Sequence, residues 1–158
     1  MTATDVLDAA KAAGLKIVTA ESCTGGMVAA ALPDLPGSSA AVECGFVTYS
    51  NEAKNGLLGV SKETLASFGA VSEEVALEMA DGALRRSLAD VSVSITGIAG
   101  PGGSEFKPEG RVCFGVARTG YPTHTETLEF GAPGRAEVRR KSCDHALTLL
   151  LRAITQDP

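Results

Sequence analysis

The chain has 158 residues, a length that fits one domain over residues 1–158, and it contains no run of about 18 apolar residues that would cross a membrane. Its 14 basic and 19 acidic side chains give a net charge of −5, which argues against binding of nucleic acid through a basic surface. The four cysteines show neither a CxxC pair nor metal-ligand spacing with the two histidines. We therefore expect a cytoplasmic protein with reduced thiols that binds neither nucleic acid nor membranes.

Helix and strand patterns alternate along the chain. The first half predicts a helix over Asp5–Ala13, a strand over Lys16–Ala20, a helix over Gly25–Leu32, a strand over Val42–Tyr49 and a short helix ending at Gly59. The second half predicts helices that begin after Ser61 and Ser72, strands over Val91–Thr96, Val112–Arg118 and Thr125–Phe130, and a helix from about Glu137 to Ile154. Because βα units precede a late antiparallel pair of strands, we expect an α/β fold, a three-layer α/β/α sandwich with a mixed sheet.

Three polar segments with glycines adjoin the predicted strands. TAESCTGG follows the first strand, PGSS and TYSNEAK flank the second, and TGIAGPGG begins at the end of the third. In open α/β sheets, ligands bind where strand ends meet loops and helix N-termini. The sequence therefore predicts that these segments converge on one pocket.

The segment TAESCTGG combines hydroxyls with two glycines at the predicted start of a helix. Ser22, Thr24 and the amides of Gly25 and Gly26 are candidates to bind a phosphate, because the positive end of a helix dipole suits an anion. A tight turn followed by a capped helix explains the same residues equally well. Glu21 is predicted either to orient the lysine of the site or a ligand hydroxyl, or to satisfy loop amides.

The segment TYSNEAK places Tyr49 and Lys54 across a junction between strand and helix. A lysine whose pKa is lowered can act as general base towards a serine, and a tyrosine can orient or relay the proton. Ser22 and Ser39 are both candidate partners, whereas the alternative for the lysine is a solvated position on a helix. Cys23 is interpreted as a packing residue, because a reactive thiolate needs an electropositive partner.

The segment TGIAGPGG contains four glycines and a proline in eight residues. Such a sequence allows the backbone, including Gly97 and Gly100, to approach a ligand closely, although a plain surface loop is the alternative. We favour a site, because the segment leaves an apolar strand through the hydroxyl of Thr96. The loop is therefore predicted to border the pocket.

Three arginines, Arg135, Arg139 and Arg140, stand near the start of the last predicted helix. The helix dipole favours acidic side chains at this end, so basic residues here suggest a phosphate clamp. A solvated basic face is the alternative.

Taken together, the segments TAESCTGG, PGSSA, GFVTYSNEAK, GAVSEEVALEMA, SITGIAGPGGSEFKPEG and AEVRR resemble the CinA C-terminal domain family, over about residues 5–154. Stand-alone members of this family are nicotinamide-nucleotide amidohydrolases. The resemblance implies hydrolysis of the carboxamide of nicotinamide mononucleotide to nicotinate mononucleotide and ammonia. It also implies an α/β/α fold, no metal and no cofactor. The loop GPGGSEF is one residue shorter than in many relatives.

The resemblance also implies roles for individual residues. Lys54 matches the base of a Ser/Lys pair, and Tyr49 is its neighbour in the site. Matching hydroxyls stand at Ser22, Ser39 and Thr96, and a substrate-binding arginine matches Arg139 or, next, Arg135. The choice of nucleophile between the two serines stays open. We expect a homo-oligomer, as is common for small α/β enzymes, and the alternative function is a non-catalytic nucleotide-binding or partner-interaction domain of the same fold.

Overall fold

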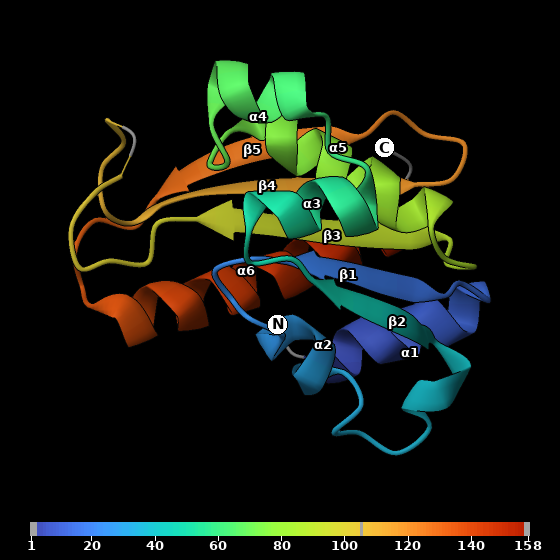
Figure 1. Ribbon diagram of the computed structural model, residues 1–158. Coiled ribbons are helices and arrows are strands. Elements are labelled where there is room, and N and C mark those ends of the chain that lie inside the picture. Colours follow the sequence, from blue (N-terminus) through green and yellow to red (C-terminus); the bar gives the residue numbers. More distant parts are fainter. Residues whose placement is uncertain (1–2, 105, 157–158) are drawn as a thin grey trace.

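The computed structural model describes residues 3–104 and 106–156, and its centre is a five-stranded sheet with helices on both faces (Figure 1). The strands are β1 (Ile17–Glu21), β2 (Val42–Val47), β3 (Val91–Gly97), β4 (Arg111–Arg118) and β5 (His124–Glu129). The helices are α1 (Ala3–Ala13), α2 (Met27–Ala31), α3 (Asn51–Leu58), α4 (Lys62–Phe68), α5 (Glu73–Arg85) and α6 (Arg135–Thr155), with a 3-10 turn at Ser38–Ala40. None of the described helices has the length and apolarity that a membrane span requires.

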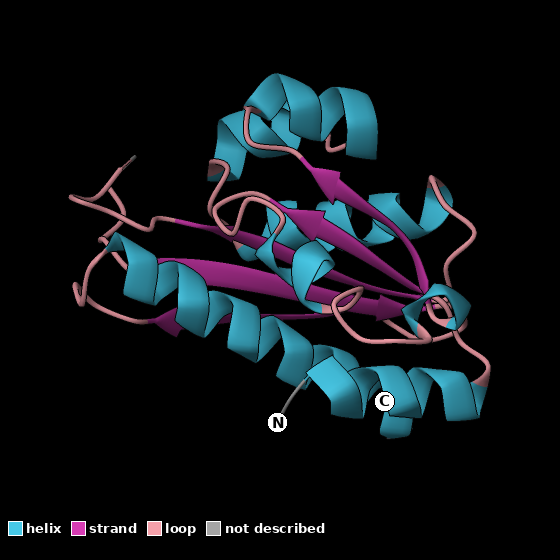
Figure 2. Ribbon diagram, turned by 90° about the horizontal axis from the view of Figure 1, so that it is seen from below, coloured by secondary structure: helices cyan, strands magenta, loops and turns pink. Residues whose placement is uncertain are grey.

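The sheet has the order β2-β1-β3-β4-β5 and is mixed, as predicted. β1 runs parallel to both β2 and β3, whereas β4 pairs antiparallel with β3 and with β5. Figure 2 shows the sheet between two layers of helices. The predicted three-layer α/β/α sandwich is therefore confirmed.

The helix predicted over Gly25–Leu32 is shorter in the structure, where α2 covers only Met27–Ala31. Gly25 and Gly26 have φ values of 60° and 104°, which are left-handed conformations that glycine adopts without a steric penalty. These two residues form the turn between β1 and α2 instead of the first turn of the helix. The strand predicted to reach Tyr49 ends at Val47, so that residue lies in the loop after β2.

Each face of the sheet has its own apolar core. On one face, Ile17 of β1 belongs to a cluster that also contains Val6 of α1 and Leu150 of α6. On the other face, Val18 belongs to a cluster with Met79 of α5. β1 is buried along its whole length because helices cover both faces, as is usual for strands in parallel pairs.

Hydroxyl groups of β3 connect the sheet to α5. Ser92 donates to the carbonyl of Ala80 at 2.8 Å, and Ser94 donates to that of Ala76 at 2.6 Å. A Cβ at Gly115 of β4 would lie 2.6 Å from the Ala76 carbonyl oxygen, so the helix backbone lies directly on the sheet. These contacts satisfy the buried hydroxyls and determine the position of the helix N-terminus, which is next to the candidate site.

Candidate active site

The carboxyl ends of β1, β2 and β3 meet at one end of the sheet, where their arrowheads point in Figure 1. A cavity of about 330 Å³ opens there. Its walls come from the segments after these strands, from the loop between α4 and α5, and from the start of α6. The polar side chains in the walls belong to Ser22, Tyr49, Asn51, Lys54, Thr96, Ser104 and Arg135.

Lys54 points into the protein from α3 and is only 1% exposed. Ser50 begins the helix and its hydroxyl accepts from the amide of Ala53 at 3.0 Å, which places Lys54 one turn into the helix. The Lys54 Nζ atom lies 3.0 Å from Ser22 Oγ and 2.9 Å from the carbonyl oxygen of Thr48. The alternative of a solvated lysine is therefore wrong.

The contacts of the Lys54 amine suit a general base. Burial lowers its pKa, because the charged form loses its hydration. The carbonyl oxygens of Thr48 and Tyr49, at 2.9 and 3.4 Å, accept two N–H groups. In the charged form the third N–H donates to Ser22 Oγ. The neutral form has two N–H groups and one lone pair, so at this contact the lone pair can accept the hydroxyl proton of Ser22. The geometry thus allows proton transfer from serine to lysine.

Glu21, at the end of β1, is fully buried and satisfies groups of the following loop. Its Oε1 accepts from the Thr24 hydroxyl at 2.6 Å and from the amides of Gly26 and Val28 at 3.2 and 3.0 Å. Its Oε2 accepts from the amide of Ala29 at 3.0 Å. The Thr24 hydroxyl and the Gly26 amide are therefore occupied within the protein, which corrects their predicted role in phosphate binding. The structure therefore favours the second interpretation of Glu21, in which its carboxylate satisfies backbone amides.

Arg139 contacts the same loop from the opposite side. Its Nε donates to the carbonyl oxygen of Cys23 at 3.0 Å, and its Nη2 donates to that of Thr24 at 3.3 Å. The Gly25 amide closes the turn by donating to the Ser22 carbonyl oxygen at 3.0 Å. A Cβ at Gly25 would lie 3.2 Å from Arg139 Nη2. Neither Gly25 nor Arg139 is among the described residues that line the cavity, so the geometry does not support the expected contact of either residue with the substrate.

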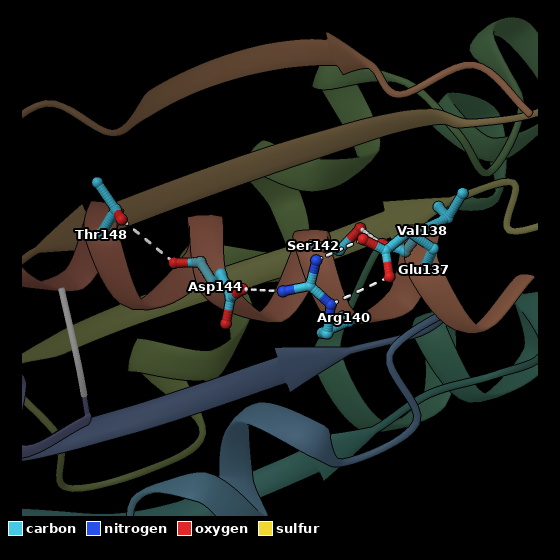
Figure 3. Close-up of polar contacts among 6 residues, drawn as sticks. All are labelled: Glu137, Val138, Arg140, Ser142, Asp144 and Thr148. Atoms are coloured by element: carbon cyan, nitrogen blue, oxygen red, sulfur yellow. Dashed lines mark hydrogen bonds and ion pairs between the residues drawn. The ribbon is translucent and has the colours of Figure 1, made fainter. Parts of the chain in front are cut away.

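Arg135 is the arginine that reaches the cavity. Its Nη2 donates to the Tyr49 hydroxyl oxygen at 2.7 Å, and its Nη1 donates to the Gly100 carbonyl oxygen at 2.7 Å. Arg140 instead pairs on the exposed face of α6 with Glu137 and, at 3.0 Å, with Asp144 (Figure 3). The three arginines thus occupy different places: Arg135 lies at the cavity, Arg139 lies behind its wall and Arg140 lies on the exposed face of α6.

The loop after β3 borders the cavity, as predicted. Gly97 and Gly100 are both part of the wall. The hydroxyl of Thr96 donates to the carbonyl oxygen of Ala70 at 2.8 Å and so draws the α4–α5 loop to the site. Sequence reasoning missed the two wall residues of that loop, Ala70 and Val71, because long-range contacts such as this one bring them there.

The remaining candidates, Ser39 and Cys23, occupy different positions. Ser39 is exposed and precedes the start of β2, whereas Lys54 follows its end, and six residues of strand separate the two by roughly 20 Å. Within one chain, therefore, the structure does not bring Ser39 to Lys54. Cys23 lines the cavity, but burial raises the pKa of its thiol to about 11, which disfavours the thiolate.

Comparison with known proteins places these features in a family context. Residues 1–154 match the family described as CinA C-terminal domain. The Escherichia coli K12 protein named nicotinamide-nucleotide amidohydrolase PncC is 52% identical over 150 residues, which cover 94% of this chain and 90% of that protein. A CinA-like protein of Chloroherpeton thalassium is 56% identical over 126 residues, or 77% of this chain.

The match to that CinA-like protein covers only 30% of its length, so the chain spans about a third of such longer relatives. Among solved structures, the competence damage-inducible protein A of Klebsiella pneumoniae superposes with a TM-score of 0.93 at 38% identity, covering 99% of this chain and 96% of that one. A competence/damage-inducible protein of Agrobacterium tumefaciens superposes with a TM-score of 0.89 at 46% identity, covering 96% of each chain.

Proposed function

Because the chain belongs to the CinA C-terminal domain family, we propose that it is an amidohydrolase that converts nicotinamide mononucleotide to nicotinate mononucleotide and ammonia. The observation that carries the proposal is the 3.0 Å contact between the buried Lys54 amine and the Ser22 hydroxyl at the wall of a cavity. The relative that bears the name nicotinamide-nucleotide amidohydrolase matches nearly the whole chain, which supports this substrate.

In the proposed reaction, Lys54 and Ser22 act as a base and nucleophile pair. The neutral amine takes the hydroxyl proton while the serine oxygen attacks the carboxamide carbon, and the resulting ammonium then gives this proton to the departing nitrogen. Ammonia leaves and an ester of Ser22 remains. Water attacks the ester with Lys54 as base again, which releases the carboxylate and restores the serine. Backbone groups of the loop after β3, which line the cavity, are proposed to stabilise the tetrahedral oxyanion.

Arg135 is proposed to bind the phosphate of the substrate. It is the one arginine in the part of the cavity wall that the structure describes. The Tyr49 hydroxyl and the Gly100 carbonyl orient its guanidinium, whose planar set of donors suits a phosphate. Binding energy from the phosphate can position the distant carboxamide for attack.

Turnover of nicotinamide mononucleotide, followed by ammonia release from the purified protein, tests the proposal. We expect Lys54→Ala and Ser22→Ala to lower kcat by about 10²- to 10⁴-fold, because each removes one member of the proton-transfer pair. Ser39→Ala is the matched control and should retain wild-type activity. The absence of turnover by the unmodified protein would contradict the proposal.

The same measurements separate the alternatives. Loss of activity in Ser39→Ala with activity retained in Ser22→Ala would make Ser39 the nucleophile, delivered by a second copy of the chain. The proposal includes a homo-oligomer, which light scattering tests, and a cytoplasmic location. Tight binding of nicotinamide mononucleotide without turnover would instead indicate the non-catalytic binding domain.

A further inference from the structure

We infer that Glu21 and Arg139 are positioning residues that hold the Ser22 hydroxyl against Lys54, and that neither of them contacts the substrate. The inference rests on the proposed function for the identity of the nucleophile. The clamp is the name used below for three parts together: the Glu21 side chain, the Arg139 side chain and the loop of residues 22–26 that lies between them.

The two charged side chains of the clamp bind complementary backbone groups, the carboxylate binding amides and the guanidinium binding carbonyls. Glu21 accepts from the last amide of the loop and from two amides at the start of α2, and Arg139 donates to two backbone carbonyls of the loop. The carboxylate is fully buried and receives four donors, two from the loop and two from the first turn of α2, so its hydrogen-bonding capacity is directed to the loop and to the helix that follows it. A loop with hydrogen bonds on both sides has little freedom to shift relative to the sheet.

Ser22 is the residue that this arrangement places. Its amide donates to the Ile95 carbonyl oxygen of β3 at 3.0 Å, and its own carbonyl accepts from Gly25 at 3.0 Å. Arg139 then binds the carbonyl oxygens of the next two residues, Cys23 and Thr24. The backbone around the serine is therefore attached to β3 before it and to α6 after it, while the hydroxyl contacts Lys54 in front.

The position of the clamp relative to the cavity argues against a ligand role. Ser22 and Cys23 line the cavity, but Glu21, Thr24 and Arg139 do not, so the charged groups lie behind the nucleophile. The guanidinium of Arg139 has a planar fork of donors that fits two successive carbonyl oxygens, a geometry that lysine does not reproduce. Because an error of about 1 Å in the placement of a reacting group can cost about 10²-fold in rate, loss of one side of the clamp should affect the chemical step.

The test compares Arg139→Met with the matched variant Arg135→Met on two substrates, nicotinamide mononucleotide and the nucleoside that lacks its phosphate. For Arg139→Met we expect kcat to fall about 10- to 100-fold on both substrates, with KM changed less than about threefold. The preference for the phosphorylated substrate should be unchanged. For Arg135→Met we expect KM for the nucleotide to rise and the preference to shrink.

Further variants keep the test decisive. Glu21→Gln replaces one acceptor by a donor that faces the loop amides, and it should reproduce the fall in kcat. If either variant fails to fold, as judged by its melting curve, Arg139→Lys takes its place with the same expected pattern. Calorimetric titration of the nucleotide into Ser22→Ala carrying Arg139→Met should give the affinity of Ser22→Ala alone.

Two results would overturn the inference. One is an unchanged kcat in the Arg139 variants, and the other is a weakened affinity with a lost preference for the phosphorylated substrate, which would make Arg139 a phosphate ligand. The failure of the proposed function is distinct from both, because the unmodified protein would then turn over neither substrate. In that case, weaker nucleotide binding caused by Arg139→Met alone would still overturn the inference. Faster hydrogen exchange of the Gly26, Val28 and Ala29 amides in Arg139→Met than in Arg135→Met would support it.

Discussion

Lys54 combines two properties that conflict in most proteins, a titratable side chain and almost complete burial. An ammonium group in this place loses its hydration, which is why its pKa is lowered. The carbonyl oxygens of Thr48 and Tyr49 offset part of this cost, because they accept from the amine whether or not it is protonated. The remaining penalty lowers the pKa of the amine and so favours its neutral, basic form, which the proposed reaction requires.

This penalty should be visible in the pH dependence of stability. Between the lowered pKa of Lys54 and its usual value of 10.5, the unfolded chain binds a proton that the folded chain does not, so the free energy of unfolding rises with pH. A Lys54→Met variant lacks this contribution and should show a shallower rise. Denaturant unfolding of both proteins between pH 7 and pH 10 measures the difference.

The comparison is robust to other effects of the substitution. Methionine leaves two carbonyl oxygens without their lysine donor, but this loss shifts the stability of the variant by the same amount at every pH. Cys44, Cys113 and Cys143 contribute equally to the two slopes. Cys23 lies near Lys54, but burial raises the pKa of its thiol to about 11, so it stays protonated in the folded protein over this pH range. Equal slopes would mean that Lys54 has an ordinary pKa in the folded protein.

At the scale of elements, Lys107 connects the loop after β3 to the segment that joins α4 and α5. Its Nζ donates to the carbonyl oxygens of Phe68, at 2.6 Å, and Val71. A backbone pair between Ser104 and Lys107 shapes the loop itself, with N···O distances of 3.0 and 2.8 Å. Since both connected segments line the cavity, Lys107 holds two of its walls together from outside.

We expect Lys107→Met to raise KM for nicotinamide mononucleotide by about 3- to 30-fold, because the two walls lose a charged link worth about 1.5–3 kcal/mol. The hydrogen bonds of Ser22 and Lys54 do not involve Lys107, so kcat should change less than KM. The matched control is Lys62→Met, which alters an exposed lysine of α4. Steady-state kinetics decide the case: a fall in kcat at constant KM would show that the link acts on the chemical step instead.

At the scale of the whole molecule, the sequence predicts the sheet and the end of the sheet at which the site forms. Parallel strands followed by polar segments place Ser22, Lys54 and Thr96 together, and no contact information is needed for that step. The separate roles of Arg135 and Arg139 could not be predicted, because the two arginines are four residues apart on the same face of α6. Only their positions along the helix decide which one meets the cavity and which one meets the clamp. The position of Lys107 depends on how α4 and α5 pack over the sheet, which local patterns do not encode.

The packing of whole layers also determines where Lys54 lies, because α3 carries the lysine and rests against α5. Gly82 of α5 makes this contact possible: a Cβ there would lie 1.9 Å from the carbonyl oxygen of Leu58, the last residue of α3. Gly56 of α3 is exposed, and a Cβ there would meet nothing within 4 Å. The two helical glycines therefore differ only in what stands beside them.

Alanine at these two positions should have opposite effects. Gly82→Ala forces α3 away from α5 and should lower the free energy of unfolding by about 1–3 kcal/mol. Gly56→Ala should raise it by about 0.5–1 kcal/mol, since alanine reduces the backbone entropy lost on helix formation. Thermal melts would show shifts of about 2–4 °C for each kcal/mol in a chain of this size.

Activity then distinguishes a local loss of stability from a displaced lysine. Below the melting temperature, Gly82→Ala should retain its fold but lose kcat, because α3 moves with Lys54 and lengthens the contact between its amine and the Ser22 hydroxyl. Gly56→Ala should keep wild-type kcat. Gly82→Ala could instead melt at a lower temperature yet keep full kcat at low temperature. The position of Lys54 would then not depend on the contact between α3 and α5, and the carbonyl oxygens of Thr48 and Tyr49 alone would hold the amine.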